Sequence, residues 1–147
     1  MDDAQFHAMV DSIQEKVFQD AEEAYGAVGF DRWRNPRFNG VIDIPDATGC
    51  ITGDCGDTMK IFLQFEQDTV SNASYITDGC ASSSICGSFA AEMAIGKTIE
   101  QIFDLTGDDI LNHLGQFPKN ETHCAFLAVK TLQEAVNQYM IKQTRQK

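Results

Sequence analysis

Three of the five cysteines lie where a thiol could bind a metal ion or attack sulfur. Cys55 lies in the segment Gly53–Asp57, whose glycines let the backbone and ligands approach an ion closely. Cys80 immediately precedes an expected helix, and Cys124 lies beside His123 in the first turn of another. Because the partial positive charge at a helix N-terminus favours the thiolate, we expect Cys80 and Cys124 to ionise readily.

These three thiols, together with Asp57 and His123, form a candidate soft-metal site. Three cysteines, one aspartate and one histidine suit one or two metal ions or an iron-sulfur cluster. Their separation along the chain is no obstacle if strand and helix ends converge at one edge of a sheet. The spacing lacks the paired Cys-x-x-Cys motifs of a compact zinc finger. The spacing of these residues alone therefore favours neither the presence nor the absence of a metal site.

The other two cysteines have simpler interpretations. Cys86 lies six residues after Cys80, about 240° around a helix of 3.6 residues per turn, so we expect it to be a buried packing residue. Cys50, five residues before Cys55, is interpreted mainly as a packing or incidentally exposed thiol, with an accessory role at the site as the alternative. Two further histidines are expected at the surface or at helix caps: His7 and His113.

Composition excludes several classes of function. The 147 residues carry 22 Asp and Glu against 11 Lys and Arg, a formal charge of -11 that repels both nucleic acids and anionic lipids. No apolar run approaches the roughly 20 residues that span a bilayer, and the N-terminus lacks the order of a secretory signal. We therefore expect a cytoplasmic protein that binds neither nucleic acid nor membrane, and whose odd number of thiols stays free.

Helical spacing dominates the N-terminal part of the chain. It predicts an amphipathic first helix that ends at Gly26 and presents these apolar residues: Phe6, Met9, Val10, Ile13, Val17, Ala21 and Ala24. Residues 26–40 are rich in Gly and Pro and predict an irregular connection, in which Arg32, Arg34 and Arg37 surround Trp33. We interpret this connection as a loop with solvated arginines, and a docking surface for a partner is the alternative.

The remaining elements predict an α+β fold. Short or alternating apolar patterns predict strands over residues 41–44, 57–65 and 70–77. Helical patterns follow over residues 82–95, from a capping box at Thr98–Gln101, and over residues 108–114 and 122–141. Strands followed by helices indicate a small antiparallel sheet, about three-stranded, with helices packed on one face.

The 147 residues are about one domain's worth, and 43% of them are hydrophobic, enough for one sizeable core. We expect a single domain over residues 1–147. The first part, residues 1–34, holds the N-terminal helix and connecting loop. The core motif region covers residues 35–140, and residues 141–147 form a tail.

Several segments resemble the iron-sulfur cluster assembly scaffolds of the IscU type, also called the NifU N-terminal domain family. Asn35–Gly40 is similar to the Asn-Pro-Arg-Asn-x-Gly segment that precedes the first cysteine loop of that family. The further matching segments are Gly53–Lys60, Asp78–Ser84, Gly96-Lys97 and His123–Ala128. They occur in the right order over residues 35–139, which makes the joint resemblance specific.

The resemblance implies both a fold and a role. It implies an α+β fold with a three-stranded sheet, and a site made of Cys55, Cys80 and Cys124 with Asp57 and His123. In such scaffolds a cysteine desulfurase delivers persulfide sulfur, iron joins it, and the cluster passes to acceptor apoproteins. The protein would thus be a carrier rather than a classical enzyme, with Cys124 as the main sulfur acceptor. A 2Fe-2S cluster is favoured over 4Fe-4S, held by one chain or shared across a homodimer.

Some features depart from the resemblance. Residues 117–122 lack the Leu-Pro-Pro-Val-Lys sequence through which many such scaffolds engage a chaperone. The 43 residues between Cys80 and Cys124 leave no room for the insertion typical of the zinc-bearing SufU branch, which also lacks the histidine. Two alternatives stay open. One is a zinc-stabilised sulfur-relay or binding domain using the same ligands. The other, disfavoured because nucleophile and base would be adjacent on one helix, is a Cys–His hydrolase or transferase.

Overall fold

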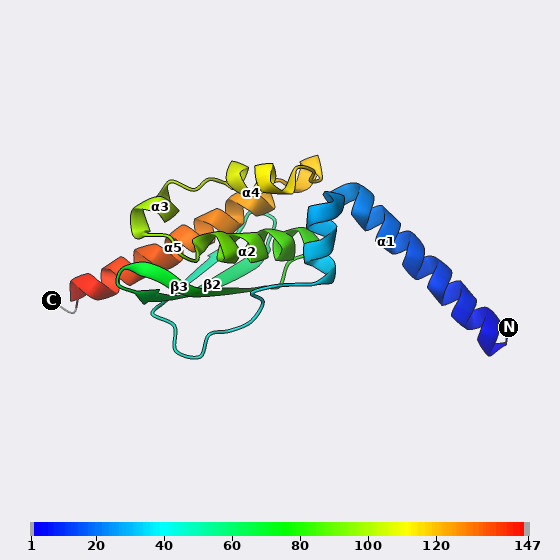
Figure 1. The fold of residues 1–147 in the computed structure, drawn as a ribbon, viewed down its shortest axis with the longest axis horizontal. Helices are drawn as coiled ribbons and strands as arrows, with labels where there is room; N and C mark the ends of the chain where they lie inside the picture. The colour runs from blue at the N-terminus through cyan, green and yellow to red at the C-terminus, as the bar shows by residue number, and fades with distance from the viewer. Residues whose placement is uncertain (1, 146–147) are drawn as a thin grey trace.

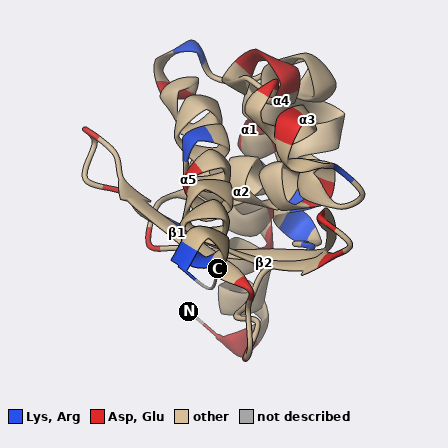
Figure 2. Ribbon diagram, turned by 90° about the vertical axis from the view of Figure 1, so that its left-hand side faces the viewer, with Lys and Arg blue, Asp and Glu red and all other residues tan. Residues whose placement is uncertain are grey.

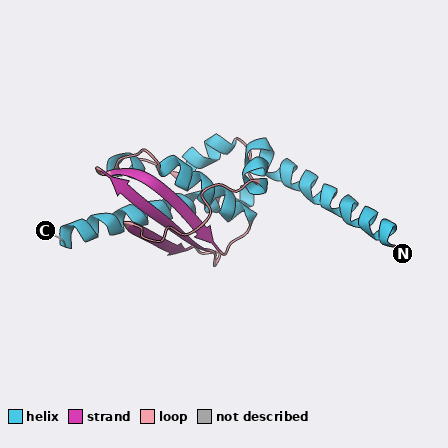
Figure 3. Ribbon diagram, turned by 60° about the horizontal axis from the view of Figure 1, so that its bottom comes forward, coloured by secondary structure: helices cyan, strands magenta, loops and turns pink. Residues whose placement is uncertain are grey.

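The computed structural model describes residues 2–145, in which one three-stranded sheet is covered by helices on one face (Figures 1 and 3). This confirms the predicted α+β class with its small antiparallel sheet. The elements in chain order are α1 (Asp3–Arg34), β1 (Ala47–Thr52), β2 (Thr58–Glu66), β3 (Thr69–Thr77), α2 (Ala81–Ala94), α3 (Ile99–Phe103), α4 (Gly107–Leu114), the 3-10 turn η1 (Lys119–Glu121) and α5 (His123–Arg145).

The central strand β2 organises the core. It pairs antiparallel with β1 on one side and β3 on the other. Met59, Ile61 and Leu63 alternate along β2 and are completely buried, because α2 and α5 pack across this face. The alternation that predicted strands over residues 57–65 and 70–77 is therefore confirmed within one residue at each end.

The first strand is not where the sequence pattern put it. Residues 41–44 form an exposed loop, in which the side chains of Val41 and Ile44 are 61% and 83% exposed, so the prediction of a strand there is wrong. The strand that pairs with β2 is instead β1. Its residues are small or polar for the most part, because β1 lies directly against the backbone of α5, and so they lack the apolar alternation of an ordinary strand.

Replacing Gly49 by alanine is expected to lower the free energy of unfolding by about 2 kcal/mol or more. A Cβ atom at Gly49 would overlap the Thr131 carbonyl oxygen and lie 2.5 Å from the Ala135 nitrogen, so α5 would have to move away from β1. Urea denaturation measures the effect, with Gly53→Ala as control, since a Cβ there meets Leu127 at an ordinary 3.4 Å. Equal stability losses in the two variants would contradict the close approach of β1 and α5.

Helix α1 is longer than predicted. It bends at Gly26, whose φ of 75° suits glycine, and then continues to Arg34 instead of ending (Figure 1). The helical hydrogen bonds resume because the second half packs on the body of the protein, where Gly29 lies against Leu114. The irregular connection predicted over residues 26–40 therefore begins only after Arg34.

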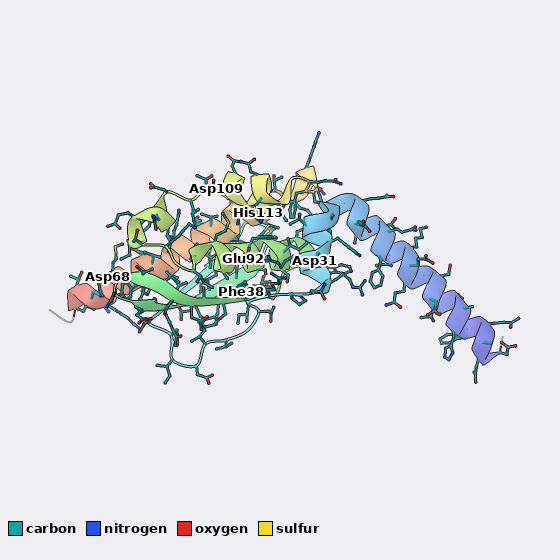
Figure 4. All side chains as sticks on the ribbon, in the orientation of Figure 1. Asp31, Phe38, Asp68, Glu92, Asp109 and His113 are labelled. Carbon is teal, nitrogen blue, oxygen red and sulfur yellow. The ribbon has the colours of Figure 1, made fainter. Side chains whose placement is uncertain are left out.

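Arg32 is not the solvated arginine that the sequence suggested. Its guanidinium is buried and donates to Ser88 Oγ at 2.9 Å and to Glu92 Oε1 at 3.0 Å. It also stacks over the ring of Phe89 at 3.9 Å. Glu92, which lies on α2 in Figure 4, thus joins α2 to the second half of α1 through a part-buried ion pair. Arg34 and Arg37 are exposed, so the interpretation as solvated side chains holds for these two, and Arg34 also stacks on Phe18 at 4.0 Å.

The later helices largely follow their predicted ranges. α2 and α4 agree within one residue with the predictions for residues 82–95 and 108–114. The capping box at Thr98 and Gln101 is confirmed at the start of α3. α5 continues to Arg145, so most of the tail predicted over residues 141–147 is helical, while residues 146–147 lie outside the described residues. Among residues 2–145, no helix has the length and apolar character needed to cross a membrane.

Candidate metal centre

The predicted site residues gather at one end of the sheet, where the β1–β2 loop meets the first turns of α2 and α5. Cys55 is exposed in that loop, which is closed by hydrogen bonds from Gly53 N to Asp57 O and from Gly56 N to Gly53 O. Cys80 is exposed at the N-cap position of α2, and Cys124 is the second residue of α5. Convergence of strand and helix ends, assumed from the sequence, is what the fold provides.

Ser83 connects three of these segments. Its hydroxyl donates to Asp57 Oδ2 at 2.9 Å and lies 3.5 Å from Cys124 Sγ, so it can instead donate to that sulfur when the thiol is ionised. Ser83 is fully buried at the start of α2. Sequence reasoning did not assign it a role, although a run of three serines in the first turn of an otherwise apolar helix was a visible signal. Ser83 therefore fixes the position of both the carboxylate and the buried thiol.

Cys124 differs from the expectation of a readily ionised thiol. It is 1% exposed, and this burial raises its pKa to about 11 despite the partly offsetting hydrogen bond from Ser83. Negative charge on Cys80, Cys55 and Asp57 raises the pKa further. Burial thus outweighs the helix N-terminus, and in the metal-free protein the thiol is protonated at neutral pH. His123 Nε2 lies 3.7 Å from Cys124 Sγ, the adjacent group that can take its proton.

The other cysteines and histidines lie outside this cluster. Cys86 is fully buried in α2, as predicted, and burial raises its pKa well above the usual value. Cys50 is exposed on β1, whereas its neighbour Gly49 faces α5, so Cys50 points to the opposite face of the sheet. His7 and His113 are exposed, on α1 and α4, as expected for surface residues (Figure 4 labels His113).

The predicted ligands are close but do not surround a common point. Within residues 2–145, no three His, Cys, Asp or Glu side chains are arranged so that they could hold one metal ion. Asp57 and Cys124 contact Ser83 instead, while Cys55 and Cys80 are exposed. The donor set suits soft metals, with three thiols supplemented by one imidazole and one carboxylate. Binding therefore requires the two exposed thiols and the Ser83 contacts to rearrange.

A cleft of about 470 Å³ opens beside Cys55 and His123. Its cationic residue is Lys130, about two helical turns beyond His123 on α5. The cleft is lined by Ile51, Thr52, Gly53, Asp54, Cys55, His123, Phe126, Leu127 and Lys130. It leaves one side of the cysteine cluster accessible from solvent.

A second polar network ties α1 to the same end of the molecule. Tyr25 OH lies 3.1 Å from Ser82 Oγ, which also hydrogen-bonds the Glu121 carboxylate. Burial raises the pKa of Tyr25 above its usual value. Ser82 and Glu121 stand next to the segments that carry Cys80 and His123, so the bend of α1 is anchored at the edge of the cysteine cluster.

Comparison with known proteins identifies the family. The family model of the NifU-like N terminal domain matches residues 24–146. Iron-sulfur cluster assembly scaffold protein IscU 1 of Archaeoglobus fulgidus is 37% identical over 114 residues, which cover 77% of this chain and 74% of that protein. The scaffold protein IscU of Aquifex aeolicus is 34% identical over 124 residues, 82% of this chain and 79% of that protein.

The fold is also found among solved structures. The N-terminal NifU-like protein from Brucella abortus superposes with a TM-score of 0.65 at 17% identity, covering 82% of this chain and 97% of that one. This likeness concerns the fold and agrees with the three-stranded sheet and its helices. The match over residues 24–146 and the sequence relatives at more than 30% identity establish that this chain belongs to the NifU-like N terminal domain family.

Proposed function

We propose that this protein is a scaffold on which an iron-sulfur cluster is assembled and then passed to acceptor apoproteins. The observation that carries the proposal is the convergence of three thiols, a carboxylate and an imidazole at one accessible end of the sheet. The names of the sequence relatives support the same role. The cluster is cargo, and the protein acts as a carrier rather than as a classical enzyme. Its unpaired, exposed thiols suit the reducing cytoplasm.

The site residues have different roles, which follow from their exposure and from their chemistry as ligands. Cys55 and Cys80 are exposed and are the first thiols that iron can reach. Asp57 is a harder and weaker ligand for this kind of cargo, which keeps the cluster transferable. His123 supplies an imidazole beside Cys124. We favour a 2Fe-2S cluster, with its coordination completed by Asp57 or His123 or by a second copy of the chain.

Sulfur arrives in this proposal as the persulfide of a cysteine desulfurase. The Cys124 thiolate, formed by loss of its proton to His123, attacks the outer sulfur of the donor persulfide. A new S–S bond forms on Cys124, the donor S–S bond breaks, and the donor cysteine leaves as a thiolate. Persulfide mapping after incubation with a desulfurase and cysteine should find the label on Cys124. Label that persists on another cysteine at the same level in Cys124→Ser would contradict this assignment.

Anaerobic reconstitution tests the scaffold function directly. The protein is incubated with ferrous iron and sulfide, and absorbance, iron and sulfide content are measured before transfer to an apo-ferredoxin. We expect cluster absorbance in the protein and its later appearance in the acceptor. Absence of cluster absorbance would refute the proposal. Stoichiometric zinc that survives the addition of iron and sulfide would instead favour a zinc-stabilised sulfur-relay or binding domain.

Replacing Asp57 by cysteine is expected to slow cluster transfer several-fold. A fourth thiolate is a softer ligand than a carboxylate and holds iron more firmly. Asp54→Cys is the matched control, because it adds a thiol to the same loop while leaving the contact between Asp57 and Ser83 intact. The transfer rate to apo-ferredoxin is followed by circular dichroism of the cluster. Equal rates for Asp57→Cys and the unaltered protein would argue against Asp57 as a ligand.

A further inference from the structure

The first half of α1, residues 3–25, projects from the body as a free helix, here called the arm (Figures 1 and 4). Phe6, Val10, Ile13 and Val17 follow one another at intervals of four, three and four residues, which places them on one side of the arm. Phe6, Ile13 and Val17 are 51%, 57% and 48% exposed. Such a row of exposed apolar side chains is typical of a protein-binding surface.

The arm is anchored beside the cysteine cluster. Tyr25 at its base packs against Phe117 and lies 3.1 Å from Ser82 Oγ, and Gln116 donates to the Glu23 carbonyl. A protein bound to the arm is therefore held at the end of the molecule that carries Cys80 and Cys124. The matched family region begins at residue 24, so almost all of the arm precedes it.

The charge of the arm restricts what can cover the apolar row. Lys16 is accompanied by six acidic residues between positions 3 and 23: Asp3, Asp11, Glu15, Asp20, Glu22 and Glu23. Figure 2 shows acidic positions near the N-terminus as well as over α3 and α4. Pairing of two arms would bring like charges together, and antiparallel pairing of the apolar rows would bring Asp3 close to Asp20. Membrane-surface helices carry a basic polar face, which the arm lacks.

Resting on the scaffold function proposed above, we propose that the arm docks the sulfur-donating desulfurase. The complementary surface is an apolar groove bordered by Lys and Arg, which receives the helix as a groove receives an amphipathic peptide. The donor needs such an attachment because Cys124 is almost completely buried. A second contact raises the effective concentration of the persulfide at the site while the thiol becomes accessible.

Two acidic substitutions on the apolar row test the proposal in the full-length protein. Val10→Asp and Ile13→Asp are combined, and affinity for the desulfurase of the same organism is measured by calorimetry. We expect binding to weaken at least about tenfold, as for central contacts of an interface. The matched control combines Ser12→Asp and Gln19→Asp, which add the same charge on the opposite side of the helix. It should bind within about twofold of the unaltered protein.

A second variant tests the contribution of charge. Replacing Asp20 and Glu23 together by lysine should also weaken binding and reduce its dependence on salt, because a basic groove border would then be repelled. Circular dichroism checks that each variant keeps its helix content. Retention of the original affinity in both the apolar-row variant and this charge variant would overturn the proposal.

Cluster assembly distinguishes failure of the arm from failure of the scaffold. Desulfurase-driven assembly should slow in the apolar-row variant, whereas assembly from inorganic sulfide should match the unaltered protein. An unaltered protein that builds no cluster from sulfide would refute the scaffold function itself, independently of the arm. Sedimentation of the free protein tests whether a second copy of the chain covers the arm instead. A dimer that dissociates in the apolar-row variant, with unchanged desulfurase affinity, would show that a second copy covers the arm and would overturn the proposal.

Discussion

Replacing Cys55 and Cys80 together by alanine is expected to abolish formation of the iron-sulfur cluster. These two thiols are the exposed members of the cysteine cluster, whereas Cys124 is buried against Ser83. Without them, iron would meet one buried thiol, one imidazole and one carboxylate, too few soft ligands to retain a cluster. Anaerobic reconstitution with iron and sulfide should give cluster absorbance in the unaltered protein and none in the double variant.

Two control variants separate this effect from a general loss of thiols. Cys50→Ala removes an exposed thiol on the opposite face of the sheet, and Cys86→Ala removes a buried one from α2. Both should retain cluster formation, although Cys86→Ala leaves a small cavity and lowers stability. Equal cluster yields in Cys50→Ala and the Cys55–Cys80 double variant would contradict the assignment of ligands. Loss of the cluster in Cys50→Ala alone would point to the accessory role of that thiol.

The parts of the fold that sequence predicted well are those with one buried and one exposed side. β2 shows its alternation because only its Met59, Ile61 and Leu63 side packs against helices. β1 was missed because its contact with α5 relies on the absence of a side chain at Gly49. A glycine leaves no apolar signal, whereas the exposed apolar residues of 41–44 show the pattern of a short strand without forming one.

The site was predicted as a set of residues but not as an arrangement. Loop and helix-start positions correctly brought Cys55, Cys80 and Cys124 to one end of the sheet. The burial of Cys124 and the contact between Ser83 and Asp57 depend on how α2 packs against α5, which no local pattern encodes. Arg32 shows the same limit, because its burial requires partners on α2 some 60 positions away along the chain.

Cys124 in the metal-free protein is expected to react at least about a hundredfold more slowly with iodoacetamide at pH 8 than free cysteine does. Burial raises its pKa to about 11, so only about one molecule in a thousand carries the thiolate at that pH, against about a quarter for an ordinary thiol. Because deprotonation increases with pH, the rate should rise about tenfold for each pH unit up to about 11. Site-resolved mass spectrometry of the alkylated protein measures this rate.

Ser83→Ala should slow the reaction of Cys124 further, since the hydrogen bond to Ser83 lowers the pKa of the thiol and its loss leaves burial unopposed. Ser84→Ala is the matched control, because that serine hydrogen-bonds Tyr75 rather than the site. A Cys124 that alkylates as fast as free cysteine, with no rise above pH 9, would contradict the raised pKa. A slow, protonated thiol fits the proposed role, because sulfur is then accepted only when a docked donor exposes Cys124 and His123 takes its proton.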